Sequence, residues 1–509
     1  MQNKEMKFGA ILNYVVILVN MLVGLLYTPF MLHKLGQEEY GLYSLAASVI
    51  SYLTVLDLGI GNAIVRYTSK FRATGEKEKM QNMFGMFLIL YICIGSIALI
   101  AGTLLTINCE NIFNATMSAD ELYKTKTMLW LMTLNLAFTF PMSIWGSIMT
   151  AFERFIFQRT INIIRSVLNP LVMVLLLMIG YKAIAMVIVT TIFNILTLFI
   201  NYYYCKRNLK IKIKFKGFEY KVLKEVSVYS FWIFLNIIMD RIYWSTGQFI
   251  LGIYKGAVAI AIYAVAIQLQ HLFTMMSTAV SGVFLPRITS ITTKENSDKE
   301  ISDIFIKTGR IQYIIISFIL SMFIVIGKPF INFWAGDGYG DSYTISLLFM
   351  LPLTVPLIQN IGITILQARN KMKFRSLLYL FISVGSFLIS IPASKHYGGI
   401  GCAVATAIAL ILGQCIIMNI YYYKKQNIDI PRFWKEIGHM SIVPMMFVTA
   451  SMFILNYTSI NLSDIKVFIV TSIILATMYC FLFWKFSINR SEKELVMSML
   501  TPIISRFKR

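Results

Sequence analysis

The chain has 509 residues, of which 57% are hydrophobic and only 14% are charged, a balance that excludes an ordinary soluble globular protein. Its formal net charge is +22 at pH 7, but the basic residues are divided among short segments between apolar stretches, which argues against a nucleic-acid-binding protein. The six cysteines include no CxxC pair and no histidine at ligand spacing, so neither a disulfide nor a metal site is predicted.

Fourteen apolar stretches are each long enough to cross a bilayer as a helix, which takes about 20 residues. The first follows Lys4 and Lys7 and is not closed by a small-residue cleavage site, so we expect it to be retained as a helix. The sequence therefore predicts an all-α, polytopic membrane protein with about 14 transmembrane helices. The stretches lie near residues 10–32, 41–65, 83–107, 127–150, 161–180, 183–204, 227–251, 258–285, 310–334, 344–367, 375–392, 398–423, 439–457 and 465–487.

The distribution of basic residues between these stretches predicts the orientation of the chain. With the N-terminus inside, the inside segments carry 37 of the 46 Lys and Arg residues and the outside segments carry eight. In this count, basic residues toward the ends of a stretch belong to the adjoining segment, and Arg241, near the middle of a stretch, accounts for the remaining one. Cytoplasmic loops are enriched in Lys and Arg, so both termini are expected in the cytoplasm.

Short motifs recur in the two halves of the chain, in the same order and at nearly constant offsets. For example, Arg66-Tyr67-Thr68-Ser69 follows the second stretch and Arg287-Ile288-Thr289-Ser290 follows the eighth. Six helices per repeat is an even number, so both halves enter the membrane the same way round. This predicts two parallel six-helix repeats followed by two further helices. The expected segments are an N-terminal bundle at 1–205, a basic cytoplasmic linker at 206–226, a C-terminal bundle at 227–425, and helices 13 and 14 with an amphipathic cytoplasmic tail at 426–509.

Two basic segments are expected on the cytoplasmic surface. In the linker, lysines and apolar residues alternate strictly from Lys210 to Lys216, which indicates an extended segment with lysines toward anionic head groups. The alternative is a segment that serves only to fix the topology. Near the C-terminus, Ser491 and Glu494 match a capping box that would begin an amphipathic helix.

The sequence contains no recognisable catalytic or phosphate-binding motif. There is no GxxxxGK[ST], HExxH or GxSxG sequence, and the four histidines are scattered over different segments. The outside loops are short, whereas an enzyme acting on an external sugar or lipid needs a larger outward platform. These observations favour a transporter without a cofactor over an enzyme.

Polar residues inside the apolar stretches are the positive evidence for function, because a charge in a membrane core usually faces a partner or a wet cavity. Asp240 and Arg241 lie near the middle of the seventh stretch, and a guanidinium is well matched to a phosphate or a carboxylate. The ion-coupling candidates are Asp240 and Asp57. The candidates for a substrate-binding cavity are Arg241, Asp240, Asn236, Asn20, Asn13, Gln248, His271, Arg165 and Asn169.

Each of these residues also has a purely structural interpretation. Asn and Gln in membrane helices often only hydrogen-bond to a neighbouring helix, and His271 is a candidate for the same role. Arg165 is close enough to the inner surface for its guanidinium to reach the head groups. Asp57 is expected near the inner end of its helix, where it would pair with Arg66 or line the inner mouth of a cavity.

The loop between the first two stretches carries a family resemblance. Residues 35–43 read LGQEEYGLY, and residues 56–63 read LDLGIGNA, ahead of Arg66-Tyr67. This combination resembles the polysaccharide (O-antigen, Wzx-type) flippases of the multidrug/oligosaccharidyl-lipid/polysaccharide exporter superfamily. The resemblance implies a bacterial inner-membrane protein that moves an undecaprenyl-pyrophosphate-linked oligosaccharide to the outer leaflet by alternating access, driven by an ion gradient. The partners it implies are the lipid-linked oligosaccharide, membrane lipids, and the polysaccharide polymerase with its chain-length machinery.

Two other classes of function remain as alternatives. One is a related exporter of cationic drugs or of a lipid-linked peptidoglycan precursor; a drug exporter would favour an acidic, aromatic cavity over one that contains Arg241. The other is a membrane polymerase or ligase for polysaccharide, which would need catalytic carboxylates or histidines on a large outer loop.

Overall fold

The computed structural model describes residues 2–216, 220–281, 291, 298–369, 371–458, 460–494 and 497, and these residues form helices and no β-strand. The predicted all-α class is confirmed. The helices are α1 (Gln2–Leu53), η1 (Thr54–Asp57), α2 (Ile60–Thr74), α3 (Lys77–Ile107), α4 (Cys109–Phe113), α5 (Ala119–Ala151), α6 (Phe155–Ile179), α7 (Ala183–Arg207), α8 (Tyr220–Tyr254), α9 (Ala257–Ser281), α11 (Asp298–Ala335), α12 (Asp341–Ile358), α13 (Ile361–Ala368), α14 (Met372–Leu410), η3 (Ile411–Ile417), α15 (Met418–Gln426), α16 (Ile430–Thr458) and α17 (Ile465–Phe486).

Among the described residues, 11 helical runs are long and apolar enough to cross a membrane. Two of them, Val15–Thr74 and Met372–Gln426, have 60 and 55 residues, and each contains two of the predicted stretches. Helix α8, with 35 residues, coincides with the seventh stretch. Over their described residues, all fourteen predicted stretches therefore fall on helices. This is the backbone arrangement that hydrocarbon requires, since it offers no other hydrogen-bond partner to peptide groups.

Glycines divide the two longest runs. Gly36 (φ 78°, ψ 172°) interrupts α1, and Gly398 (φ 57°, ψ −135°) interrupts α14. Both conformations have a positive φ that a residue with a Cβ atom rarely adopts. A run of 60 residues would extend about 90 Å as one straight helix, three times the thickness of the hydrocarbon core. A sharp bend at each glycine resolves this mismatch.

The second predicted stretch, 41–65, is not one continuous helix as expected. A 3₁₀ turn at Thr54–Asp57 is followed by Leu58 and Gly59 in the left-handed conformation, and α2 begins only at Ile60. The break follows from the LDLGIG sequence, because the left-handed backbone at Leu58 and Gly59 cannot continue a right-handed helix. It leaves Asp57 at a helix end.

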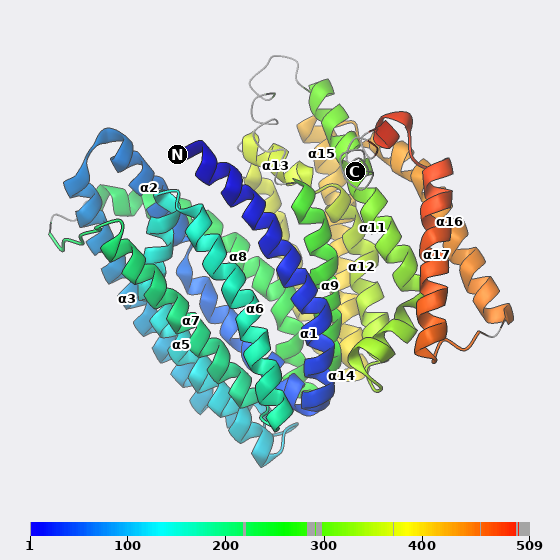
Figure 1. The fold of residues 1–509 in the computed structure, drawn as a ribbon, viewed down its shortest axis with the longest axis horizontal. Helices are drawn as coiled ribbons and strands as arrows, with labels where there is room; N and C mark the ends of the chain where they lie inside the picture. The colour runs from blue at the N-terminus through cyan, green and yellow to red at the C-terminus, as the bar shows by residue number, and fades with distance from the viewer. Residues whose placement is uncertain are drawn as a thin grey trace, which may run out of the picture. The chain divides into compact units, whose positions relative to one another are not determined.

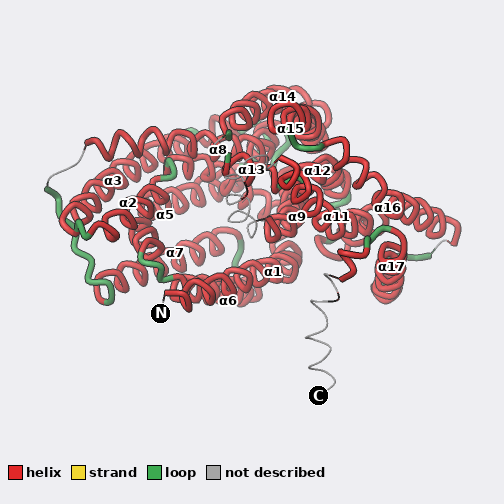
Figure 2. Tube along the Cα trace, turned by 90° about the horizontal axis from the view of Figure 1, so that it is seen from above, coloured by secondary structure: helices red, strands yellow, loops and turns green. Residues whose placement is uncertain are grey.

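The helices group into two compact units. Unit 1 comprises residues 1–267 and 376–406, and unit 2 comprises residues 268–375 and 407–509. The predicted division into two six-helix repeats concerns internal symmetry and stays a prediction. Figure 1 shows α1 of unit 1 beside α6, and Figure 2 shows α2, α3 and α5 side by side, in agreement with the contacts between these helices.

The core of unit 1 combines aromatic side chains with close helix contacts at small residues. Phe84, Phe87 and Tyr91 of α3 are fully buried against α5. A Cβ atom at Gly95 would lie 2.7 Å from the carbonyl oxygen of Ala137, so the two backbones touch at this point. Small residues have this role in membrane proteins, where close packing replaces the hydrophobic effect as the force between helices.

Unit 2 contains a buried charge cluster that attaches the segment after α17 to α11. Arg310 donates from Nε and Nη2 to the two carboxylate oxygens of Glu492 (2.6 and 3.0 Å) and from Nη1 to Glu436 (2.7 Å). The side chains of Arg310 and Glu492 are only 6% and 4% exposed. Removing either partner of such a pair destabilises the protein, because the remaining charge would be buried without an opposite charge beside it.

The capping box ahead of the tail is shifted from its predicted position. Asn489 accepts a hydrogen bond from the backbone of Glu492 (2.9 Å), and the Glu492 carboxylate accepts one from the backbone of Asn489 (2.9 Å). The cap is thus Asn489–Glu492 and not Ser491–Glu494, because Asn489 precedes the helix and Glu492 is held in place by Arg310. Of the tail beyond Glu494, only Met497 is described.

The Arg310 cluster yields a stability prediction. Replacing Arg310 with Ala should lower the free energy of unfolding by about 3–5 kcal/mol, because Glu492 and Glu436 lose their cation while Glu492 stays buried. The matched control is Arg432→Ala, which breaks an ion pair to Asp303 whose side chains are half exposed, and which should cost at most about 1 kcal/mol. Unfolding of the detergent-purified variants measures both, and equal losses would contradict a special role for Arg310.

Candidate functional site

Helix α8 carries four of the predicted cavity residues, which we call the α8 polar stripe: Asn236, Asp240, Arg241 and Gln248. These residues have different environments in unit 1. Asp240 is exposed and Arg241 is half-buried. The Nε atom of Arg241 is buried and has no hydrogen-bond partner among the described residues. Asn236 accepts a hydrogen bond of 3.3 Å from the hydroxyl of Ser376. The stripe therefore includes a guanidinium with unused donor capacity.

One face of α8 packs against other helices of unit 1. Ser51 of α1 donates to Ser245 (3.0 Å), and Tyr52 and Thr246 share a hydrogen bond of 2.6 Å. Tyr243, one helical turn from Asp240, is buried and donates to the carbonyl of Thr406 (3.2 Å). These bonds fix the rotation of α8 about its axis, so the directions of Asp240 and Arg241 are also fixed.

Gly247, two helical turns after Asp240 on the same face of α8, is also closely packed. A Cβ atom at Gly247 would lie 2.4 Å from the ring of Tyr263. A helical face of period 3.6 has the same sequence pattern whether it lines water or a neighbouring helix, so the pattern could not separate the two cases. The contacts of Tyr243 and Gly247 thus assign this part of α8 to helix packing, while Asp240 is exposed.

A second polar cluster joins α5, α6 and α7. Arg165 of α6 donates from Nη1 to the Oδ1 atom of Asn194 of α7 (3.2 Å). The amide nitrogen of Asn194 in turn donates to Asn135 (2.8 Å) and Thr139 (2.7 Å), both of α5. In this cluster Arg165 is bonded to a neutral amide and not to a carboxylate. Its positive charge is therefore left uncompensated by the cluster.

The Arg165 cluster was only partly foreseen. Arg165 was predicted, with reach to the inner surface as the alternative, but Asn194, Asn135 and Thr139 were not singled out. Their signal was present in the sequence, since Asn135 and Thr139 stand one helical turn apart in an otherwise apolar stretch. The sequence did not indicate that α5 and α7 are neighbours, so the hydrogen bonds between them could not be predicted.

The other predicted site residues are distributed over both units. In unit 1, Asn20 is exposed on α1, Gln248 is half-buried on α8, and Asn169 on α6 has a buried Oδ1 atom without a partner among the described residues. His271 is exposed and belongs to unit 2. The side chain of Asn13 lies outside the described part of the chain. Whether these residues contact substrate stays a prediction.

Asp57, the second ion-coupling candidate, lies at the helix break before α2. Its Oδ1 atom accepts a hydrogen bond of 3.1 Å from the hydroxyl of Tyr91, a buried residue of α3. The carboxyl group is therefore linked to the helix core of unit 1. Its role in ion coupling stays a prediction.

Glu39, within the LGQEEYGLY loop, joins three helices and was not predicted as a functional residue. Its carboxylate lies 2.9 Å from the ammonium of Lys124 on α5 and 3.8 Å from that of Lys182, and it accepts a hydrogen bond from the backbone of Ala183 (3.3 Å). Ala183 is the first residue of α7, where a negative charge is favourable. The side chain of Glu39 is 6% exposed. The loop residue that carries the resemblance thus has a structural role within unit 1.

An apolar cavity of about 330 Å³ lies within unit 1, next to the packed face of α8. Its lining comes from α1, α3, α8 and α14 and includes Tyr52, Leu105, Phe249 and Phe387. The hydrogen bond between Tyr52 and Thr246 lies in its wall. The lining is otherwise apolar, so this cavity fits hydrocarbon better than sugar.

No three His, Cys, Asp or Glu side chains come together as a metal site within the described ranges. The chemistry that the described site offers is instead hydrogen bonding by amides and hydroxyls, together with two guanidinium groups and two carboxyl groups. Such groups bind and orient a polar or anionic molecule.

Comparisons with known proteins agree with this picture. A family model described as polysaccharide biosynthesis protein matches residues 7–292. A putative O-antigen transporter of Shigella flexneri is 21% identical over 398 residues, covering 77% of this chain and 92% of that protein.

The fold is shared with solved transporter structures. A structure of the lipid II flippase MurJ in an inward closed conformation covers 94% of this chain and 99% of its own, with a TM-score of 0.71 and 18% identity. An inward-facing multidrug resistance MATE family transporter of the MOP superfamily covers 82% of this chain and 99% of its own, with a TM-score of 0.59 and 12% identity. These likenesses confirm the predicted polytopic fold, and the resemblance stated from the loop motifs is confirmed by the family and the sequence relative.

The Glu39 contacts predict that this residue matters for stability more than its neighbour does. Glu39→Ala should lower the free energy of unfolding by about 1–3 kcal/mol, because the start of α7 loses an acceptor and Lys124 loses a buried partner. Glu38→Ala, next to it and exposed, should change stability by less than about 0.5 kcal/mol. Thermal unfolding of the two purified variants compares them directly. If Glu38→Ala were the more damaging change, the structural role of Glu39 would be refuted.

Proposed function

The chain belongs to the polysaccharide biosynthesis protein family, and on that premise we propose that it moves an undecaprenyl-pyrophosphate-linked oligosaccharide from the cytoplasmic to the outer leaflet. The Shigella flexneri relative, a putative O-antigen transporter, supports a substrate of this class. The work of such a flippase is physical and not catalytic: it supplies hydrogen-bond partners to a head group that hydrocarbon cannot solvate.

The observation that carries this proposal is the presence of guanidinium groups with unused binding capacity in membrane helices. Arg241 has a buried Nε without a partner in the described part of the chain, and Arg165 is bonded to the neutral amide of Asn194. A cation in a membrane helix is costly to keep unless it has a function. The pyrophosphate of the substrate is an anion whose oxygens match the fork of donors that a guanidinium presents.

The remaining polar groups suit the sugars of the substrate. Asn135, Asn194 and Thr139 offer donors and acceptors in one connected cluster, which is the chemistry that sugar hydroxyls require. Beside α8, the apolar cavity of about 330 Å³ is a place for part of the polyprenyl chain. In the predicted topology, its residues Leu105, Phe249 and Phe387 lie in the outer half of the bilayer.

The direction and driving force are part of the same proposal. The positive-inside distribution supports a bacterial inner-membrane protein with both termini in the cytoplasm. Alternating access between inward-open and outward-open states would carry the head group, and Asp240, exposed beside Arg241, is the proposed ion-coupling group, with Asp57 as the second candidate. Arg165 and Arg241 disfavour the alternative of cationic drugs, because like charges repel in a poorly solvated site.

The phosphate-binding role of Arg241 is tested by its removal. In cells that depend on this protein, Arg241→Ala should reduce export at least tenfold, since losing a hydrogen bond to a charged group costs about 1.5–3 kcal/mol. The variant should be inserted at normal levels while lipid-linked oligosaccharide accumulates on the cytoplasmic side. Arg490→Ala, which removes the same charge from a side chain that is 95% exposed, is the control and should leave export unchanged. Normal surface polysaccharide in the Arg241→Ala strain would refute this role.

The coupling role of Asp240 calls for a different measurement. Asp240→Asn keeps the shape of the side chain but removes its capacity to exchange a proton or hold a cation, so transport should lose most of its dependence on the ion gradient. Transport into vesicles is compared with the gradient intact and collapsed, and Asp337→Asn, on an exposed turn outside the helices, is the control. A variant that responds to the gradient as the unaltered protein does would remove Asp240 from this role.

A further inference from the structure

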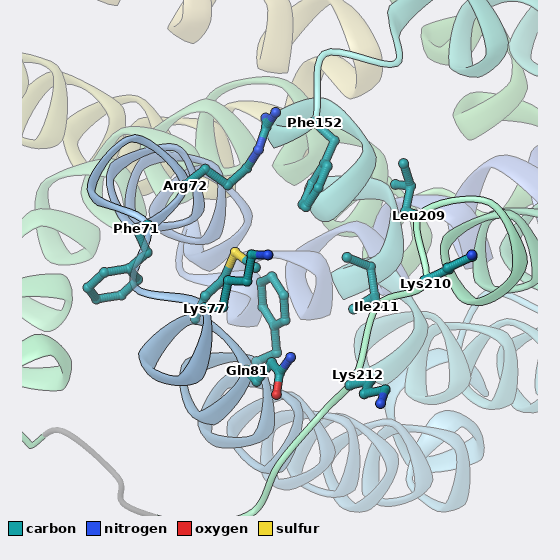
Figure 3. A pocket seen from close by; sticks show the side chains of 12 residues that line it. Phe71, Arg72, Lys77, Gln81, Phe152, Leu209, Lys210, Ile211 and Lys212 are labelled. Carbon is teal, nitrogen blue, oxygen red and sulfur yellow. The ribbon is translucent and has the colours of Figure 1, made fainter.

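A basic pocket lies in unit 1 at the ends of helices that the topology places on the cytoplasmic side. It has a volume of about 350 Å³ and is formed by the turn between α2 and α3, the junction of α5 and α6, and the linker (Figure 3). Four of its lining residues are cationic, namely Arg72, Lys77, Lys210 and Lys212, and none of its lining residues is acidic. Its polar rim therefore favours an anion.

The linker is docked against α3 by specific contacts. The backbone of Lys214 donates to the carbonyl of Gln81 (3.1 Å), and its ammonium pairs with Glu78 (2.8 Å). Gly85 permits this approach, since a Cβ atom there would lie 2.0 Å from the carbonyl oxygen of Lys214. The linker thus forms one wall of the pocket in a defined position, which a mere topology anchor would not require.

The alternation predicted for the linker has a structural consequence. Ile211 and Ile213 pack against the core of unit 1, while Lys210 and Lys212 are exposed. With Ile211 and Ile213 packed inward, the two lysines beside them remain on the exposed side of the linker. Two of these lysines then fall on the rim of the pocket.

The other cations of the pocket are also held in place. Arg72 donates from Nη1 to the carbonyl of Ala151 (2.6 Å), and its guanidinium stacks on the ring of Phe152 at 4.2 Å. Lys77 is the first residue of α3, where the helix dipole adds to the positive potential. These contacts use backbone oxygen and an aromatic face, so they leave the charge of Arg72 uncompensated.

Two acids near the α2–α3 turn are engaged with other lysines. Glu76 pairs with Lys79 (2.5 Å), and a hydrogen bond from that ammonium holds the pKa of the Glu76 carboxyl below its usual range. Glu78 pairs with Lys214. The floor of the pocket is apolar and includes Phe71 and Phe84, both buried. A cationic rim over an apolar floor matches a ligand that carries a phosphate and a hydrocarbon part.

We propose that this pocket binds the phosphate head group of an anionic phospholipid of the cytoplasmic leaflet. A lipid fits better than a soluble anion because the floor offers apolar contact and because helix ends on this side lie at head-group depth. A lipid bound there would bridge the α2–α3 turn and the linker. This site is separate from the transport function, and its test does not depend on transport.

The experiment measures lipid binding to the full-length protein by native mass spectrometry. Detergent-purified protein is titrated with phosphatidylglycerol, and with phosphatidylcholine as the zwitterionic comparison. The double variant Lys210→Gln/Lys212→Gln should bind phosphatidylglycerol about thirtyfold more weakly, since each basic residue near an anionic surface contributes roughly a factor of five. The control, Lys424→Gln/Lys425→Gln, removes the same charge from exposed lysines outside the pocket and should bind as the unaltered protein does.

The other outcomes separate the alternatives. Equal binding of phosphatidylglycerol by the two double variants would overturn the proposal, as would equal binding of phosphatidylcholine and phosphatidylglycerol by the unaltered protein. Inorganic phosphate is added in a further arm. If phosphate alone displaces the lipid at comparable concentration, the pocket is a site for a soluble anion and the lipid assignment falls. All four substituted lysines are exposed, so folding should be retained, and unchanged thermal unfolding verifies this.

Discussion

Hydrocarbon offers no hydrogen-bond partner, and this single constraint accounts for most of the secondary structure and polar contacts of the chain. It forces the backbone into helices and makes every polar side chain between them find a partner within the protein or face water. Glu39, Asn194 and Arg310 meet the constraint in three ways: an ion pair at a helix start, a chain of amides, and a buried charge cluster. Polar residues that do not meet it are therefore informative, because their cost must be offset by function.

The same constraint explains how much could be predicted from the sequence. The fourteen stretches fall on helices because hydropathy reports the solvent of each segment directly. The bend at Gly36 lies between two predicted stretches, and the bend at Gly398 lies at the first residue of one, for the same reason. The break at Asp57 was missed, since a helix interrupted by left-handed residues has the same apolar composition as a continuous one. Pairings such as Asn194 with Asn135 depend on which helices meet, and composition carries no information about that.

Arg310 and Arg241 show why a residue type alone does not identify a site. Both are arginines at helical positions, and the charge count assigned Arg310 to the positive inside segments. In the structure, Arg310 is buried and pairs with two carboxylates, so its charge is neutralised within unit 2 and stabilises it. Arg241 has a buried Nε without a partner in the described residues, so its binding capacity is left for another molecule. The distinction rests on partners, which only coordinates supply.

Arg165 and Arg72, two cationic groups of unit 1, have different surroundings, and these surroundings decide what each would bind. Around Arg165 the neighbours are amides and hydroxyls, so a phosphate held there would have its sugars solvated by side chains. Around Arg72 the neighbours are aromatic, so a phosphate held there would have hydrocarbon against Phe71 and Phe84. In each place the guanidinium would bind the phosphate. The side chains around it would then decide which molecule carries that phosphate. The two proposals thus assign the sugar-linked substrate to polar surroundings and the resident lipid to aromatic ones, although both ligands present a phosphate.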